Sequence, residues 1–411
     1  MPHDIADAPH WHEPGRDICA GAPTFRRVNT PYDAFMEGEG IPVHRNIGVA
    51  GLRDLPLKPW ARTGGRGSFI QLFGTEGLWG SYIVEVPGAG ALSAERHLYE
   101  EIFLVLGGRG TTEIWLDGQD TPEIFEWQKG SLFSIPMNAH HRIVNAAADP
   151  ALLLAGTSAP NMFNLICDER AIFGCPMNLR RRYHPGHDAF APSEGLEPDP
   201  ARGLAMCRTN VIPDVFSAEL YLDNRRLPGY RRMEPKMAEN VFYQYIGEFP
   251  SGRYSRGYSP GAAAAFICIG GKGYSLTWPM DLGPTPWRDG HGDEVLRQDY
   301  DSERVSMVSA APMAECGWFH QHFSTGEAPL RLLAWYGPNN HRAQKAGVPG
   351  ETVADVGVID VTEPGGSSIP YWLEDPHVRE AFAAELEREG TENRMEDRFY
   401  DSRTTYSFAG V

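Results

Sequence analysis

"ERHLYEEIFLVLGGRG", residues 95–110, places a histidine and several carboxylates directly before a run of strand-forming apolar residues that ends in glycines. Charged side chains are rarely buried unless they are paired or hold a metal ion. Because alternate residues of an extended strand share a face, Glu95 and His97 should point the same way and Arg96 the other way. Glu101 begins the apolar run. The stretch therefore predicts a polar site at the start of a buried strand.

A second stretch supplies partners for these side chains. "GSLFSIPMNAHHRIVN", residues 130–145, reads as a strand that ends in a proline-bearing turn and delivers His140 and His141, which strand parity places on opposite faces. One or two carboxylates with two imidazoles, drawn from adjacent strands, form a ligand set for a divalent first-row metal with open coordination positions.

Short apolar runs separated by turn residues surround both stretches. From Gly67 onward they read "SFIQLFG", "SYIVEVPG", "EIFLVLGG", "TTEIWLDG", "SLFSIP" and "ALLLAGT". This pattern is typical of an antiparallel barrel or jelly roll. The same pattern of short apolar runs occurs again later in "VFYQYIGEFPSG", "AAAAFICIGGKGYSLTW", "RVSMVSA" and "LRLLAWYG". Since "FLVLGGRGTTEIW" aligns with "FICIGGKGYSLTW", we expect an internal duplication.

The two site-bearing stretches resemble the cupin superfamily, whose motifs run H-x-H-x3-E-x6-G and G-x5-P-x-G-x2-H-x3-N. The corresponding residues here are Glu95, His97, Glu101 and Gly108 in the first motif, and Gly130, Pro136, Asn138, His141 and Asn145 in the second. The spacing matches throughout. Glu95 replaces the first histidine of the family, and Asn138 replaces its glycine; asparagine tolerates the left-handed conformation that glycine would supply.

The resemblance implies a barrel that holds a divalent transition metal through His97, Glu101 and His141. Glu95 is then either a further metal ligand or a catalytic acid or base in the cavity. Fe(II) is the favoured metal, with Mn, Ni or Zn as alternatives. A cupin barrel that has lost its metal, with the two histidines as hydrogen-bonded interior residues, is the competing interpretation.

The second half serves as an internal control. When Gly270 is aligned with Gly107, the positions of Glu101, His97 and Glu95 are taken by Ala264, Pro260 and Tyr258. Only His320 and His322 then remain as possible ligands. These residues make a poor metal site. We therefore expect a two-domain cupin, or bicupin, with one working metal site and one structural or regulatory barrel.

The predicted fold is mainly β, with two tandem cupin jelly-roll barrels. The expected domains are an N-terminal arm (1–64) with a short helix at "PYDAFMEGEG", a first barrel (65–160), a helical or irregular linker (161–237), a second barrel (238–345) and a tail (346–411). Helical spacing of Val378, Phe382 and Leu386 predicts a helix in the tail.

Composition limits the partners. The formal net charge of −17 over 411 residues opposes binding to nucleic acid. Six scattered cysteines without a CxxC pair suit a reducing, cytoplasmic environment. From the polar first residues we expect neither a secretion signal nor a membrane anchor, and none of the apolar runs approaches transmembrane length. The expected partner is a small-molecule substrate, and a homo-oligomer is compatible with the sequence.

The fold does not determine the reaction. The favoured hypothesis is an Fe(II) dioxygenase that uses O2 on a small hydroxylated aromatic or enolisable compound, because two imidazoles and a carboxylate leave room for both reactants. The alternative enzyme class is a redox-neutral decarboxylase, isomerase or lyase with Glu95 as acid or base. A small-molecule binding protein with a structural metal is the non-enzymatic alternative. By strand parity Arg96 and Arg142 face outward, so the sequence offers no evident clamp for a substrate carboxylate.

Overall fold

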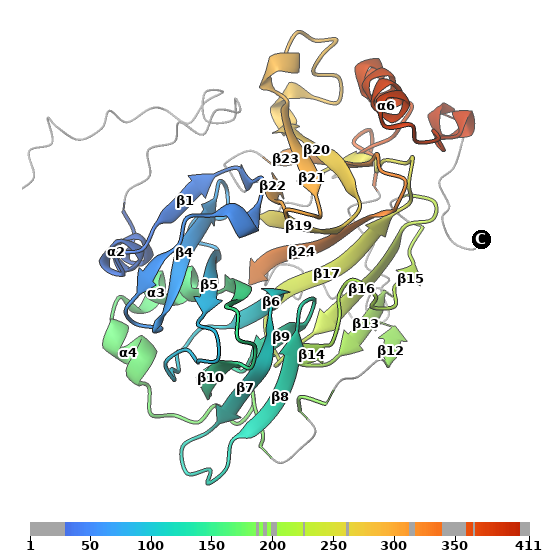
Figure 1. Cartoon of the computed structure of the whole chain (residues 1–411). Helices are drawn as coiled ribbons and strands as arrows, with labels where there is room; N and C mark the ends of the chain where they lie inside the picture. The colour runs from blue at the N-terminus through green and yellow to red at the C-terminus, as the bar shows by residue number, and fades with distance from the viewer. Residues whose placement is uncertain are drawn as a thin grey trace, which may run out of the picture.

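The first half of the chain folds into one large and one small sheet (Figure 1). The computed structural model describes residues 29–185, 189–191, 195–198, 204–224, 227–259, 263–311, 317–338, 359–364 and 366–402. The large sheet has the order β1 (Val43–Asn46), β4 (Gly65–Leu72), β5 (Gly80–Val86), β11 (Ala151–Thr157), β6 (Glu101–Gly107), β9 (Leu132–Ile135) and β14 (Val211–Ile212), with β3 (Lys58–Trp60) paired to β4. The small sheet has the order β10 (His140–Asn145), β7 (Arg109–Trp115) and β8 (Glu123–Gln128).

These two sheets enclose a common core. Phe103 and Phe133 of the large sheet share one hydrophobic cluster with Ile114 and Ile143 of the small sheet. The helices α2 (Pro31–Gly38), α3 (Ala159–Ile166) and α4 (Glu169–Gly174) pack on the same cluster. The first half is therefore one barrel with a helical cover.

The short helix α2 confirms the helix expected at "PYDAFMEGEG". It begins with a capping box, because the Thr30 hydroxyl accepts a hydrogen bond from the Asp33 amide and the Asp33 carboxylate accepts one from the Thr30 amide. Proline at the first helical position supports the same start.

The second half repeats the plan. Its large sheet has the order β12 (Leu196–Pro198), β13 (Ala205–Arg208), β16 (Arg231–Lys236), β17 (Phe242–Phe249), β24 (Leu330–Pro338), β19 (Ala264–Gly270), β22 (Met307–Ala311) and β2 (Gly48–Val49), with β15 (Tyr221–Leu222) paired to β16. Its small sheet has the order β21 (Leu296–Asp301), β20 (Lys272–Pro279), β23 (Trp318–Ser324), β18 (Gly257–Tyr258) and β25 (Ser368–Ile369). Short 3-10 helices are η2 (Leu52–Asp54), η3 (Met280–Leu282), η4 (Gly292–Glu294) and η6 (Asp397–Tyr400).

The two large sheets pack back to back. Leu104 and Leu154 of the first barrel share a buried cluster with Ile246, Ile267 and Trp335 of the second. A sheet that is covered on both faces reads as a continuous apolar run instead of an alternating one. This explains the run in β6, where successive residues face the barrel core and the junction in turn.

The tail helix α6 (Pro376–Glu389) lies over the small sheet of the second barrel (Figure 1). Val378, Phe382 and Leu386 are buried in a cluster with Phe323 of β23, so the helix predicted from their spacing is confirmed. Asp375 caps its first turn, and Gly390 ends it in the left-handed conformation.

The mainly β, two-barrel fold predicted from the sequence is confirmed. The domain boundaries stay predictions, and the sheets extend beyond them. Within the expected arm, β1 and β3 join the first barrel while β2 pairs with β22 of the second. Within the expected linker, β12, β13 and β16 join the second large sheet, so the prediction of a helical or irregular segment is wrong there.

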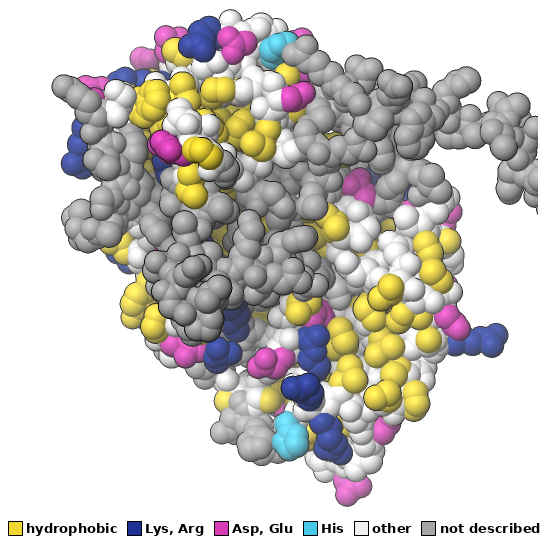
Figure 2. Space-filling model, turned by 180° about the vertical axis from the view of Figure 1, so that it is seen from behind, with side chains coloured by type: hydrophobic (Ala, Val, Ile, Leu, Met, Phe, Trp, Pro, Cys, Tyr) yellow, Lys and Arg dark blue, Asp and Glu magenta, His cyan; other side chains and the backbone are white. Residues whose placement is uncertain are grey.

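On the face seen in Figure 2, basic and acidic side chains of the described residues lie interspersed. In the part of the chain that the structure describes, every helix is too short or too polar to cross a bilayer.

Candidate metal centre

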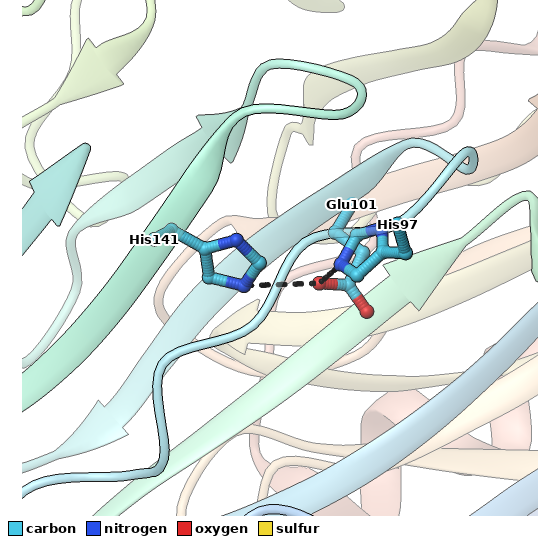
Figure 3. A group of neighbouring side chains, drawn as sticks. All are labelled: His97, Glu101 and His141. Atoms are coloured by element: carbon cyan, nitrogen blue, oxygen red, sulfur yellow. Dashed lines mark hydrogen bonds and ion pairs between the residues drawn. The ribbon is translucent and has the colours of Figure 1, made fainter. Parts of the chain in front are cut away.

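Three side chains from different elements of the first barrel converge (Figure 3). His97 lies in the segment before β6, Glu101 is the first residue of β6, and His141 lies in β10. His97 Nε2 is 3.0 Å and His141 Nε2 is 4.0 Å from Glu101 Oε2, and one ligand atom from each residue lies within 4.8 Å of the others. Their side chains are 1–3% exposed. The structure therefore brings together the three residues that the sequence predicts as metal ligands, and their role as ligands stays a prediction.

Hydrogen bonds orient both imidazoles toward the carboxylate. His97 Nδ1 lies 3.0 Å from the Tyr99 carbonyl, and His141 Nδ1 lies 3.4 Å from the Ala139 carbonyl. Because a carbonyl only accepts, each Nδ1 is the donor in its contact, and the Nε2 of each ring faces the Glu101 carboxylate, where a metal ligand would be needed. Two imidazole nitrogens and a carboxylate oxygen then meet in a buried space, an arrangement that a cation stabilises. The donor set fits a divalent transition metal.

The protonation states agree with this fit. Burial, followed by the neighbouring His97, lowers the pKa of His141 to about 4, so the imidazole is neutral near pH 7, as a metal ligand must be. Burial alone would raise the pKa of Glu101. The charge and hydrogen bond of His97, the nearby His141 and the Tyr82 hydroxyl outweigh it and lower that pKa.

Strand register identifies the equivalent positions of the second barrel. Tyr82, Ala155 and Phe103 lie side by side in the first large sheet, as Tyr245, Ala334 and Phe266 do in the second. Glu101 lies two residues before Phe103, and Ala264 lies two residues before Phe266.

The small sheets repeat the same correspondence. Glu95 forms an antiparallel bridge with His141, as Tyr258 does with His320. His320 is therefore the counterpart of His141, and His322 is not. Pro260, expected at the position of His97, lies outside the described residues.

The chain is similar in structure to proteins whose sequences differ strongly from its own. No family model matches, and no curated protein matches. Among solved structures, a single-residue variant of Bacillus subtilis oxalate decarboxylase aligns with a TM-score of 0.44 at 13% identity, over 72% of this chain and 78% of that one. A formate complex of Lactobacillus farciminis oxalate decarboxylase aligns with a TM-score of 0.43 at 12% identity, over 70% and 86%. Likeness at this level does not bear on the reaction.

The repeated sheets, the matched registers and the triad at the motif positions decide the fold. The chain has a bicupin fold. The first cupin barrel carries the candidate metal centre, and at the described equivalent positions the second has Ala264, Tyr258 and His320.

Residues around the triad fix its members. The Tyr82 hydroxyl donates a 2.7 Å hydrogen bond to Glu101 Oε1, which leaves Oε2 directed at the histidines. The Tyr99 ring stacks on His97 with centroids 3.6 Å apart. Asn138, which replaces the cupin glycine, has a φ of 60°, so the left-handed conformation expected for it is present.

Glu95 lies beside the triad and outside the group of converging ligand atoms. Its Oε1 is 4.0 Å from His141 Nε2, and its Oε2 accepts a hydrogen bond from Arg62 Nη1. Burial raises the pKa of Glu95, although Arg62 and then His97 oppose that rise. The structure thus pairs Glu95 with a cation beside the triad, and its part as a ligand or as an acid or base stays a prediction.

Arg62 is a site residue that the sequence analysis missed. It lies in the turn between β3 and β4, and its Nε donates a 2.8 Å hydrogen bond to Glu39. The guanidinium also lies over the Trp60 ring at 4.8 Å. Side-chain exposure is 22% for Arg62 and 18% for Glu95, so this ion pair forms the solvent-facing edge of a buried site. Arg62 is 33 residues from Glu95 in the chain and belongs to neither motif.

The outward-facing residues lie as strand parity predicted. His140 contacts Asp117 at 2.9 Å, and Arg96 pairs with the same carboxylate. Arg142 pairs with Glu113 at the surface. They take no part in the triad.

Proposed function

We propose that this bicupin is a metal-dependent enzyme that transforms a small carboxylate in its first barrel without net redox change, by decarboxylation, isomerisation or elimination. The observation that carries this proposal is the Arg62–Glu95 ion pair at the exposed edge of the triad. It brings an anion-binding group and a proton-transfer group beside the three candidate ligands. The sequence alone offers no such cation, because Arg62 belongs to neither motif.

Each residue has a distinct part. His97, Glu101 and His141 would hold the divalent cation, which would polarise a substrate oxygen as a Lewis acid. Arg62 presents planar N–H donors that match a carboxylate, and it is partly exposed, so a substrate can reach it.

Glu95 is proposed as the acid or base. A substrate carboxylate that engages Arg62 competes with Glu95 for the same guanidinium. The Glu95 carboxylate, 4.0 Å from His141 Nε2, then becomes available to take a proton from the substrate or return one. The stacked Tyr99 and the buried positions of the triad limit the access of water.

A second candidate is the Fe(II) dioxygenase acting on a hydroxylated aromatic or enolisable compound. The observation in its favour is the donor set itself, since two histidines and one carboxylate are the ligands of many non-haem iron oxygenases. The same set accepts Mn, Ni or Zn, so the triad alone does not select iron.

Metal reconstitution distinguishes the two. Protein loaded separately with Fe, Mn, Ni and Zn is screened in an oxygen electrode and, anaerobically, by mass spectrometry against β-keto acids, dicarboxylates, hydroxylated aromatics and β-dicarbonyls. We expect metal-dependent turnover of a carboxylate without oxygen consumption. Turnover that requires Fe and O2 would establish the dioxygenase, and silence with tight ligand binding would favour a binding protein.

Arg62→Gln tests the recognition step. We expect KM for the carboxylate substrate to rise by about tenfold or more, because a charge-assisted pair is lost. Arg66→Gln is the matched control, since Arg66 is an exposed arginine at the start of β4 that pairs with Glu85 away from the site. An Arg62→Gln variant as active as the control would contradict the proposal.

A further inference from the structure

The described residues of the second barrel offer no matching ligand set, yet the start of its strand β17 is hydrogen-bonded to the residue that precedes Glu101. Three consecutive residues of the second half, Asn240, Val241 and Phe242, lead into β17. They contact the first barrel at Glu100 and at Ser134.

Glu100 lies between two ligands in the chain, one residue before Glu101 and three after His97. By strand alternation Glu101 points into the first barrel and Glu100 points away from it. The Glu100 carboxylate accepts hydrogen bonds from the Val241 amide at 3.0 Å and the Phe242 amide at 2.9 Å. The residue is fully buried, so these contacts are shielded from water.

Two further contacts complete the attachment of Glu100. Arg182, in the segment between the barrels, donates a 2.9 Å hydrogen bond to the same carboxylate and neutralises its charge. The Ser158 hydroxyl accepts a 2.9 Å hydrogen bond from the Glu100 amide. The chain between the two ligands is thereby anchored at a single point, just before the strand begins.

The main chain of Glu101 is held from the same segment. The Asn240 side-chain amide donates to the Ser134 hydroxyl at 2.7 Å, and that hydroxyl donates to the Glu101 carbonyl at 3.0 Å. Glu101 is thus attached to the entry of the second barrel through its preceding residue and through its own carbonyl.

We propose that Glu100, with Asn240, is a positioning residue through which the second barrel sets the placement of the metal ligand Glu101. The second barrel then serves the first as a scaffold for its metal centre. This inference rests on the proposed metal site and not on which reaction the site performs. Groups that orient metal ligands commonly change metal affinity by 10–100-fold when they are removed.

The test is a Co(II) titration of the full-length protein followed by visible absorption, which reports both affinity and ligand geometry. We expect Glu100→Gln to weaken Co(II) binding by about tenfold or more and to alter the spectrum. Glu234→Gln is the matched control, because Glu234 is an equally buried carboxylate that pairs with Arg232 inside the second half. It should lower stability and leave Co(II) affinity unchanged.

A second variant keeps the test decisive if Glu100→Gln does not fold. Asn240→Ala removes one neutral hydrogen bond and should weaken Co(II) binding several-fold, with the fold confirmed by circular dichroism. Variants that bind Co(II) with wild-type affinity and spectrum overturn the positioning role alone. Wild-type protein that binds no Co(II) overturns the metal site and, with it, this inference.

Discussion

Removal of the Tyr82 hydroxyl should weaken metal binding while the metal ligands remain intact. Tyr82 donates a 2.7 Å hydrogen bond to Glu101 Oε1, and both residues are buried. A hydrogen bond to a charged group contributes roughly 1.5–3 kcal/mol, and its loss leaves one carboxylate oxygen without this donor. Because this hydrogen bond orients Glu101 as a metal ligand, its loss should appear mainly in metal binding. Tyr82→Phe should therefore lower metal affinity by about 10–100-fold.

Tyr245→Phe is the control for this prediction. By strand register Tyr245 is the counterpart of Tyr82 in the second barrel, but its hydroxyl lies 3.3 Å from the Tyr336 hydroxyl and Ala264 replaces the carboxylate. Both variants lose a buried hydroxyl, so both should lose some stability. The assay is isothermal titration with Mn(II) or Co(II). Equal metal affinities for the two variants would refute the reasoning.

Three further predictions follow from the site and from one distant carboxylate. His141→Ala should reduce bound metal from about one equivalent per chain to a small fraction in elemental analysis, since the triad loses a ligand; two equivalents in wild type would contradict a single site. Glu95→Ala should keep the metal and lose turnover, whereas Glu101→Ala should lose the metal; loss of metal in both would make Glu95 a ligand. Burial raises the pKa of Glu374 to about 8, so its contribution to stability is complete below about pH 4.5 and disappears as pH rises through about 8. Glu374→Gln should abolish this decline, on the order of 4 kcal/mol between pH 5 and pH 9, in denaturant titrations at the two pH values; parallel pH profiles for variant and wild type would exclude Glu374 as its source.

The features that could be predicted from the sequence are those encoded locally. His97, Glu101 and His141 were found because the cupin motifs fix their spacing within two short stretches. The continuous apolar run of β6 was recognisable as a buried strand, and the spacing of Val378 and Phe382 as a helix. In each case the periodicity of one element carries the information.

The features that could not be predicted depend on which distant strands become neighbours. Tyr82 reaches Glu101 from β5, and Arg62 reaches Glu95 from the turn before β4, so sequence spacing holds no signal for either contact. Gly48 of β2 pairs with Val308 across the junction of the two barrels for the same reason. Periodicity shows on which side of a strand a side chain lies, but the pairing of distant strands decides which residues it contacts.

The position of the metal tests the central claim most directly. Crystals of the full-length protein grown with Mn(II) or Co(II) can be measured at the absorption edge of that metal, and the anomalous difference map locates every bound ion. We predict one strong peak per chain, in contact with His97 Nε2, Glu101 Oε2 and His141 Nε2. A map without a peak at this triad, or with its main peak beside His320 in the second barrel, would contradict the account.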